Sequence, residues 1–220
     1  MRLKDKTAIV TGGASGFGQG IVEAFLREGA RVMIADINGD AAADLAHRCG
    51  DKAIAQRVDV GDRASVNAMS EAARQAFGQV DILVNNAGVT HLPTPLEEVS
   101  EEEFDRVVNV NMKSVYLTAQ ALVPHMKAQG SGAILNVAST AGVSPRPNLN
   151  WYNASKGWMI TATRTMAVEL APSGVRVNAI NPVAGETPLL KSFMGEDTPE
   201  VRAKFLSTIP LGRFSTPQDM

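Results

Sequence analysis

Residues 7–18 read TAIVTGGASGFG, and this stretch decides the fold. The run Thr7–Val10 has the pattern of a buried strand, the turn Thr11–Gly18 is rich in glycine, and Gly20–Glu28 reads as an amphipathic helix. Glycine lets such a turn close tightly and lets the backbone approach a pyrophosphate, while the helix that follows offers free N–H groups and the positive end of its dipole. An ordinary strand–helix connection remains the alternative. The strand–turn–helix context favours a dinucleotide-binding turn.

Apolar runs alternate with amphipathic segments through the rest of the chain. Further strands are predicted at Arg31–Ala35, Ala53–Val58, Asp81–Val84, Ala133–Val137 and Val175–Ile180. Further helices are predicted at Asp40–Cys49, Ser65–Phe77, Glu101–Gln129 with a break near Pro124, and Tyr152–Leu170. Strands that lack polar alternation and are separated by helices predict a parallel sheet covered on both faces. We therefore expect residues 1–220 to form a single α/β domain, a doubly wound Rossmann fold.

Bulk composition restricts the classes of function. The chain has 220 residues, of which 45% are hydrophobic, and a net charge of −2, so charge gives no reason to expect nucleic acid or an anionic membrane as partner. No apolar run is long enough to span a bilayer, and the N-terminus has no signal-peptide pattern. Cys49 is the single cysteine, and His47, His91 and His125 are scattered. These features predict a cytoplasmic protein without a metal site.

One acidic residue suggests which dinucleotide is bound. Asp36 follows the second predicted strand, 18 residues after Gly18, where a carboxylate can accept hydrogen bonds from a ribose 2′-hydroxyl and would repel a 2′-phosphate. Ser15 and Ile37 occupy positions where a basic residue would hold that phosphate. The sequence therefore favours NAD over NADP, with a simple turn-capping role for Asp36 as the alternative.

A tyrosine and a lysine stand four residues apart in a segment predicted to be helical. Tyr152 and Lys156 would then lie on one face of the helix, one turn apart. A nearby ammonium favours the phenolate and lowers the pKa of the phenol, which suits proton exchange with an alcohol or a carbonyl oxygen. This spacing is common in surface helices, so its weight depends on the motifs around it.

Taken together, the motifs resemble those of the short-chain dehydrogenase/reductase (SDR) family over essentially the whole chain. The resemblance rests on their order along the sequence: Thr11–Gly18, Asp59 with Val60, Asn85–Gly88, Asn111, Ser139, Tyr152 with Lys156, and Pro182 with Thr187. Each motif alone is common, but the ordered set is specific.

The resemblance implies a set of residues that bind the cofactor, NAD. Asp59 would hydrogen-bond the adenine amino group, Val60 would pack near the base, and Thr187 would contact the nicotinamide carboxamide. The implied set is Gly12, Ser15, Gly16, Phe17, Gly18, Asp36, Ile37, Asp59, Val60, Asn86, Ala87, Gly88, Tyr152, Lys156, Pro182, Val183 and Thr187.

The resemblance also implies the catalytic residues and the reaction. Tyr152 would transfer the proton, Ser139 would hydrogen-bond the substrate oxygen, Lys156 would bind the nicotinamide ribose and lower the Tyr152 pKa, and Asn111 would hold a water next to Lys156. The implied activity is that of an alcohol dehydrogenase or ketoreductase, which moves hydride between NAD(H) and a secondary alcohol or ketone. The family also implies a homo-oligomer, a tetramer or a dimer, formed through the helix Tyr152–Leu170 and the long helix before it.

Two features depart from the family pattern. Val183 follows Pro182 where the family usually has glycine, and a β-branched residue restricts the backbone there. The sequence also stops at Met220, just as Thr216–Asp219 starts a helical pattern, so the family's last helix and last strand are expected to be missing.

The substrate end of the site is expected to be formed by residues 90–95, residues 140–151 and an irregular lid, residues 183–210. Arg146 suggests a polar substrate such as a sugar derivative or a hydroxy acid, with the charge of an acid on Arg146. A solvent-exposed arginine is the alternative. Phe193, Met194 and Phe205 would instead suit an apolar 3-oxoacyl-type substrate.

Two other functions are compatible with these motifs. A protein that only senses a dinucleotide would need the glycine-rich turn and Asp36 but not the set Asn111, Ser139, Tyr152 and Lys156. A lyase or epimerase that uses the same tyrosine would leave the redox state of the cofactor unchanged.

Overall fold

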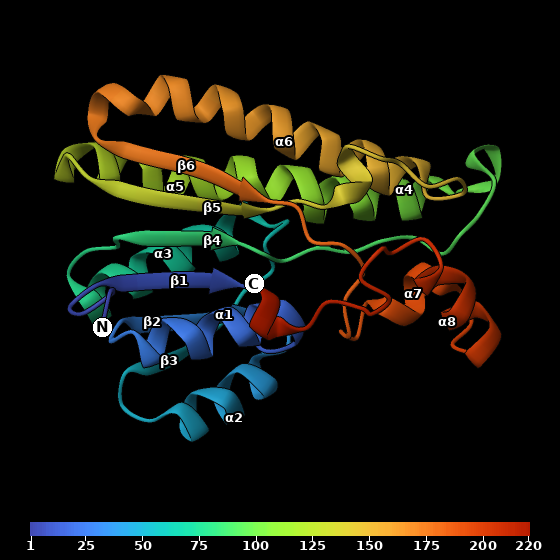
Figure 1. Ribbon diagram of the computed structural model, residues 1–220. Coiled ribbons are helices and arrows are strands. Elements are labelled where there is room, and N and C mark those ends of the chain that lie inside the picture. Colours follow the sequence, from blue (N-terminus) through green and yellow to red (C-terminus); the bar gives the residue numbers. More distant parts are fainter.

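A computed structural model describes all 220 residues and has one sheet of six parallel strands (Figure 1). The strand order is β3-β2-β1-β4-β5-β6, which confirms the predicted doubly wound parallel sheet. The strands are β1 (Thr7–Thr11), β2 (Arg31–Asp36), β3 (Ala53–Arg57), β4 (Ile82–Asn85), β5 (Gly132–Val137) and β6 (Val175–Ile180). The order reverses between β1 and β4, and the chain connections leave these two strands in opposite directions. Open α/β sheets bind ligands at the carboxyl side of such a switch point.

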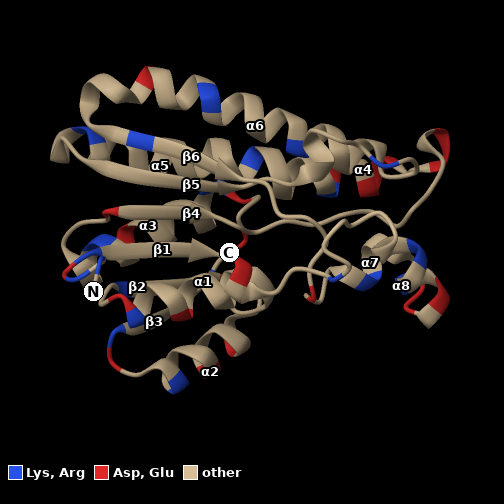
Figure 2. Cartoon of the chain, viewed as in Figure 1, with Lys and Arg blue, Asp and Glu red and all other residues tan.

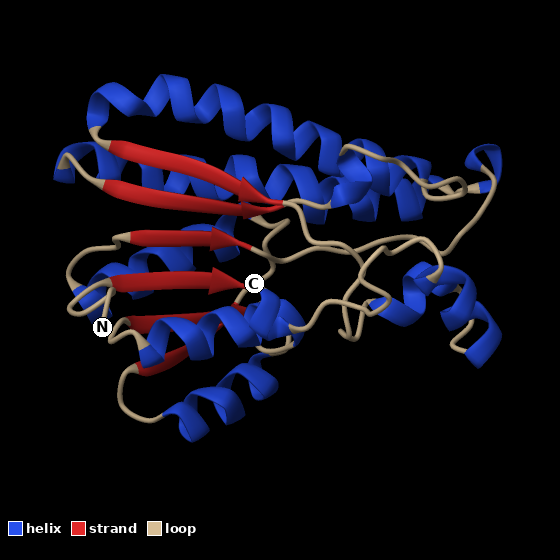
Figure 3. Ribbon diagram, in the orientation of Figure 1, coloured by secondary structure: helices blue, strands red, loops and turns tan.

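Helices cover the sheet in layers, as the separate colours of helices and strands in Figure 3 show. They are α1 (Gly16–Arg27), α2 (Gly39–Cys49), α3 (Arg63–Phe77), α4 (Glu101–Val108), α5 (Ser114–Gln129), α6 (Asn150–Leu170), α7 (Leu190–Met194) and α8 (Pro199–Leu206). Side chains alternate between the faces of a strand, so Ala8 and Val10 of β1 pack in the cluster that contains α1 and α2. Ile9 points into the opposite cluster.

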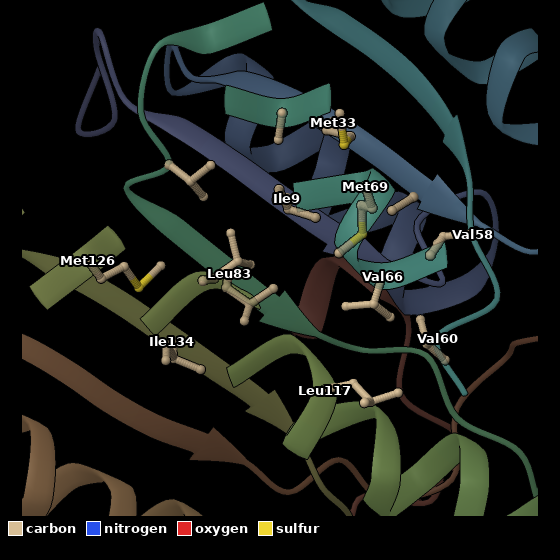
Figure 4. Packing of buried hydrophobic residues seen from close by; sticks show 14 of the residues in the cluster. Ile9, Met33, Val58, Val60, Val66, Met69, Leu83, Leu117, Met126 and Ile134 are labelled. Carbon is tan, nitrogen blue, oxygen red and sulfur yellow. The ribbon is translucent and has the colours of Figure 1, made fainter. Parts of the chain in front are cut away.

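The larger of the two cores lies between the sheet and helices α3 and α5. It joins Ile9, Leu83 and Ile134 of the sheet to Met69 of α3 and Met126 of α5, as seen from close by in Figure 4. These five side chains are at most 1% exposed. Burial of such side chains stabilises the fold by about 1.5–3 kcal/mol each, and it holds the carboxyl ends of the central strands in fixed positions.

Two of the predicted helices differ from the structure by more than two residues. Helix α1 begins at Gly16 rather than Gly20, which places Gly16 and Gly18 in its first turn. The helix predicted over Glu101–Gln129 is interrupted by a π-helical turn, Asn109–Lys113, and the break predicted near Pro124 is wrong, because α5 runs through this residue. Proline removes one backbone hydrogen bond, but Leu122 and Met126 on either side are fully buried in the larger core and keep the helix in place.

The last forty residues lie beyond the carboxyl ends of the strands. Residues 183–210 include α7 and α8, which share a small core of Leu190, Met194, Ile209 and Phe214. The chain then returns to α1, where Pro217 packs directly on Gly20, and the C-terminus lies near the end of β1 (Figure 1). Strand β6 forms one edge of the sheet.

Charges of both signs are interspersed along the helices, as on α8 in Figure 2. Exposed apolar side chains include Tyr116 on α5 and Trp158 and Val168 on α6, which are 49%, 37% and 79% exposed. These are the helices expected to join copies of the chain, and that association stays a prediction. None of the helices combines the length and the apolar character needed to cross a bilayer.

A chain of buried amides and hydroxyls connects β4 and β5 to the helices behind them. The Asn85 Nδ2 donates to Asn136 Oδ1 at 2.8 Å, and Asn136 Nδ2 donates to Thr163 Oγ1 of α6 at 2.9 Å. The Thr118 hydroxyl of α5 donates to Asn85 Oδ1 at 2.9 Å. All four side chains are at most 6% exposed, so each depends on the others for its hydrogen bonds.

Replacing Asn136 with alanine should therefore destabilise the fold. Asn136→Ala leaves the buried Asn85 Nδ2 without its acceptor, which costs about 1–3 kcal/mol of the free energy of unfolding. Urea denaturation of both proteins measures the difference. Asn178→Ala, at an exposed position of β6, is the control and should change stability by less than about 0.5 kcal/mol. Equal effects of the two variants would contradict the role of the buried network.

Candidate active site

A cavity of about 640 Å³ lies at the carboxyl ends of the strands, next to α7 and α8. Almost every predicted site residue lines it. Its lining contains Gly12, Ser15, Gly16, Phe17, Asp36, Ile37, Asp59, Val60, Asn86, Ala87, Gly88, Ser139, Tyr152, Lys156, Pro182, Val183 and Thr187. Gly18 and Asn111 are not part of this lining, but each contacts a residue that is, Gly12 and Val89 respectively.

The glycine-rich turn is held tightly against the end of β4. Gly12 and Gly16 have φ angles of +60° and +54°, a region that favours glycine, and a Cβ on Gly12 would lie 2.9 Å from the Ala87 Cα. The Asn86 Nδ2 donates to the carbonyls of Thr11 and Gly12, both at 2.9 Å. Gly18 lets α1 pack on the turn, because a Cβ there would overlap the Gly12 carbonyl oxygen.

This turn has the shape and the donors that a dinucleotide pyrophosphate needs. Any Cβ on Gly12 would fill space against β4, and the first turn of α1 begins at Gly16, which lines the cavity. The N-cap residue Ser15 makes no side-chain hydrogen bond to the helix. Unpaired N–H groups at the start of a helix are suited to bind phosphate oxygens.

At the end of β2, the Asp36 carboxylate organises the adjoining loops. One oxygen accepts from the Ala14 N–H and the other from the Asn38 N–H, both at 3.0 Å. The turn-capping role that sequence analysis left open is therefore present. Each carboxylate oxygen has a second lone pair, so Asp36 can still accept hydrogen bonds from a ligand. Asp59 likewise lines the cavity while its side chain accepts from the Gly61 N–H at 2.9 Å.

At the other end of the cavity, Tyr152 and Lys156 lie one turn apart at the start of α6. Their side chains are buried, with residue exposures of 5% and 4%. The Lys156 Nζ lies 5.9 Å from the centroid of the Tyr152 ring and donates to the Val137 carbonyl at 2.8 Å. Lysine carries three N–H donors, so further donors remain for a ligand.

Burial shifts the pKa of both groups. Desolvation raises the Tyr152 pKa to about 12, and a hydrogen bond with the Ser139 side chain opposes this rise. Desolvation lowers the Lys156 pKa to about 8. The net shift of the Tyr152 pKa is upward, because loss of water around the phenol outweighs the effect of Ser139. The lowering of this pKa by Lys156 stays a prediction.

Ser139 is placed by the turn that follows β5. It caps the 3₁₀ turn Thr140–Gly142, and its hydroxyl accepts from the Ala141 N–H at 3.1 Å. The same hydroxyl donates to the Pro182 carbonyl at 3.5 Å, and it opposes the rise of the Tyr152 pKa. Two hydroxyl groups thus line the same end of the cavity, which is an arrangement suited to bind a single substrate oxygen.

Asn111 lies in the π-helical turn between α4 and α5 and is fully buried. Its Nδ2 donates to the Val89 carbonyl at 2.9 Å and to the Ser155 hydroxyl at 3.0 Å, and its Oδ1 accepts from the Val89 N–H at 2.9 Å. A Cβ on Gly88 would lie 3.4 Å from Lys156 Nζ and 3.5 Å from Asn111 Oδ1. Asn111 therefore fixes the β4 loop beside Lys156. The water that the resemblance implies there stays a prediction.

Beyond β6, the backbone tolerates the unusual valine. Val183 has no left-handed φ, and its carbonyl accepts from the Ser215 hydroxyl at 3.3 Å. Thr187 reaches the glycine-rich turn, since a Cβ on Gly16 would lie 3.2 Å from the Thr187 Cβ. The valine thus leaves both Pro182 and Thr187 on the cavity wall.

The expected substrate-side residues are placed only in part as predicted. Phe193 and Phe205 line the cavity, and the Phe193 ring meets the Tyr152 ring edge-on at 4.9 Å between centroids. Met194 does not line it, because it packs into the core shared by α7 and α8. Residues 90–95 also lie outside the lining. Thr90 and His91 at the start of that segment are buried, at 4% and 2% exposure.

Other cavity-lining residues were missed by the sequence analysis. Arg106 of α4 and Val110 of the π-helical turn come from a helix whose amphipathic pattern gives no sign of a ligand. Only the tertiary fold brings these two side chains to the cavity. Leu149 and Leu189 also line it, and they lie in the segments 140–151 and 183–210 that were expected at the substrate end. No group of three or more His, Cys, Asp or Glu side chains is arranged to hold a metal ion.

Comparison with known proteins fits this geometry. A model of the family described as short chain dehydrogenase matches residues 6–197. The 4-formylbenzenesulfonate dehydrogenase of Comamonas testosteroni is 50% identical over 100% of this chain and 89% of its own length. The 3-oxoacyl-[acyl-carrier-protein] reductase of Thermotoga maritima is 40% identical over the same shares.

A solved structure shows the same fold with a cofactor. The crystal structure of 3-ketoacyl-(acyl-carrier-protein) reductase from Brucella melitensis complexed with NADH superposes with a TM-score of 0.93 at 49% sequence identity. The match covers 99% of this chain and 88% of that one. With the ordered motifs on one cavity wall and a family match over most of its length, this chain belongs to the short-chain dehydrogenase/reductase family of oxidoreductases.

Proposed function

We propose that this protein is an NAD-dependent dehydrogenase or ketoreductase that interconverts a secondary alcohol and a ketone, with Tyr152 as the acid and base. One observation carries the proposal: Tyr152, Ser139 and Lys156 share a cavity whose other end is the glycine-rich turn. A nicotinamide cofactor, when bound, supplies or accepts the hydride. The protein must then hold the substrate oxygen and move one proton.

The proton transfer follows from the burial of Tyr152. With a pKa raised to about 12, the phenol keeps its proton at neutral pH, which suits donation to the oxygen of a ketone as that oxygen gains negative charge. The Ser139 hydroxyl gives a second hydrogen bond to the same oxygen. Lys156, with free N–H donors beside the phenol, stabilises the phenolate that remains and is placed to bind the nicotinamide ribose.

The choice of NAD over NADP rests on Asp36. Its carboxylate lines the cavity and is fixed by two backbone N–H groups, so it cannot turn away from a ribose. A 2′-phosphate there would face this negative charge, and the neighbouring Ile37 side chain offers no positive charge to offset it. The cofactor-binding residues proposed here are those that sequence analysis assigns, with Gly18 supporting the turn from behind.

Tyr152→Phe should abolish most of the turnover. Loss of a general acid lowers kcat/KM by about 10²- to 10⁴-fold, while NADH should still bind. Nicotinamide absorbance is followed with NAD and a panel of sugars, hydroxy acids, cyclic alcohols and acyl-thioester alcohols. Tyr116→Phe, the same substitution at the one other tyrosine, is the control and should retain activity. Full activity of Tyr152→Phe would exclude the proposed acid. Binding of NADH by the wild type without turnover of any compound in the panel would favour a dinucleotide sensor.

The low pKa of Lys156 predicts a dependence of stability on pH. Unfolded lysine holds its proton to about pH 10.5, whereas folded Lys156 releases it near pH 8, so the unfolded state binds more protons between these values. The contribution of Lys156 to the free energy of unfolding should rise by about 2 kcal/mol from about pH 7 to about pH 9.5. Tyr152 titrates above this window. Urea denaturation at both pH values should show the rise in the wild type but not in Lys156→Met, and equal pH dependence would refute it.

Removing the charge of Asp36 should weaken the discrimination between cofactors. Asp36→Asn keeps the size and one of the two oxygen acceptors, so one of the two backbone hydrogen bonds can be retained, and the preference for NADH over NADPH should fall by roughly 10-fold. Fluorescence titration of each cofactor measures the two dissociation constants. Asp40→Asn, an exposed position at the start of α2, is the control. An unchanged ratio of dissociation constants in Asp36→Asn would show that other residues select the cofactor.

A further inference from the structure

Arg146 lies at the substrate end of the cavity, on the segment between β5 and α6. Its backbone is fixed next to the phenol, because the Arg146 carbonyl accepts a hydrogen bond at 2.7 Å from Asn153, the residue after Tyr152. The backbone of Arg146 is therefore attached to the first turn of α6, which also carries Tyr152.

The side chain of Arg146 is held by residues of α8 and the turn after it. Its guanidinium carbon lies 4.0 Å from the centroid of the Phe205 ring, a stacked cation–π arrangement. One N–H group donates to the Thr208 hydroxyl at 2.9 Å. Arginine has five N–H donors, and this hydrogen bond uses one of them. The guanidinium is thus oriented on the cavity wall while most of its donors remain available.

Arg146 has no acidic partner, whereas the second arginine in the cavity wall has one. Arg106 pairs with Glu103 at 2.9 Å and also donates to the Thr90 carbonyl at 2.8 Å. No carboxylate lies within ion-pair distance of Arg146. Desolvation lowers the Arg146 pKa, and no neighbouring charge opposes it. A half-buried positive charge without a counterion is costly unless a ligand supplies one.

We propose that Arg146 binds an oxyanion of the substrate, a carboxylate, sulfonate or phosphate, at the end of the molecule opposite the reacting carbon. The planar fork of a guanidinium matches such groups through paired hydrogen bonds. Phe193, edge-on to Tyr152, and Phe205, beneath Arg146, leave an apolar wall between the two polar ends. The substrate is therefore a carbonyl compound or alcohol with a flat apolar body and an anionic end.

This inference rests on the proposed function for the reacting end and adds the identity of the far end. In the reduction, bound NADH would supply the hydride to the carbonyl carbon and become NAD, and Tyr152 would give its proton to the oxygen, so that the ketone becomes an alcohol. The oxyanion takes no part in these bonds. Its binding to Arg146 sets which ketones are held with the carbonyl oxygen at Tyr152 and Ser139.

Matched pairs of ketones test the role of Arg146. The probes are 4-acetylbenzoate against 4-acetylbenzamide, and 4-acetylbenzenesulfonate against the corresponding sulfonamide, each reduced by NADH. The wild type should favour an anion over its neutral partner by roughly 10- to 100-fold in kcat/KM, the effect of a hydrogen bond to a charged group. The pair with the larger ratio identifies the preferred anion, and 4-acetylphenyl phosphate tests the third. In Arg146→Met this ratio should approach one, and Arg146→Lys should retain part of it.

Arg106→Met is the matched control, since it removes a cavity-lining arginine whose charge Glu103 already offsets. It should leave the anion-to-neutral ratio unchanged. Equal kcat/KM for anion and amide in the wild type, or an unchanged ratio in folded Arg146→Met, would overturn the inference while leaving the proposed function intact. If no probe is reduced, calorimetric titration of the same compounds into the protein with NADH measures their affinities directly. Tighter binding of the anion than of its neutral partner would support the inference, and equal affinities would refute it.

Discussion

The cavity depends on the close approach between the glycine-rich turn after β1 and the end of β4. Two hydrogen bonds from Asn86 and the near-contact of Gly12 with Ala87 hold these segments together at the point where the strand order reverses. A side chain at Gly12 would push them apart. Because the connections of β1 and β4 run in opposite directions, the space above this contact stays open, and the site forms there.

At the opposite wall of the cavity, the decisive feature is the burial of the Tyr152 and Lys156 side chains. The sheet, the β4 loop and α7 exclude water from Tyr152 and Lys156. The loss of water raises the pKa of Tyr152 and lowers the pKa of Lys156, and both shifts favour the uncharged form. The phenol is thereby kept as a proton donor, and the ammonium is kept close to losing its proton. The buried hydrogen bonds of Asn111 preserve this arrangement, since they fix the Val89 backbone next to the lysine.

The segment 183–210, which contains α7 and α8, covers the substrate end of the cavity. Residues of α7 and α8 share a small core of their own, and the same helices present Phe193 and Phe205 to the cavity. The polar and apolar signals that the sequence offers as alternatives, Arg146 and the phenylalanines, occur together in the structure, because Arg146 stacks on Phe205. In the proposed role of Arg146, an apolar wall that ends in an unpaired guanidinium would select for charge at one position of the substrate only.

Local sequence determined the sheet and its helices, because strand periodicity and glycine spacing act over a few neighbouring residues. The resemblance to the short-chain dehydrogenase/reductase family, carried by the order of the motifs, implied most of the cavity-lining residues. The turn Thr11–Gly18 and the pair Tyr152 and Lys156 are among these motifs. Tertiary structure alone decided the π-helical turn at Asn111, the continuity of α5 through Pro124, the raised Tyr152 pKa and the missing counterion of Arg146. Desolvation, packing across helices and ion pairing depend on residues distant in the chain, so a local pattern cannot reveal them.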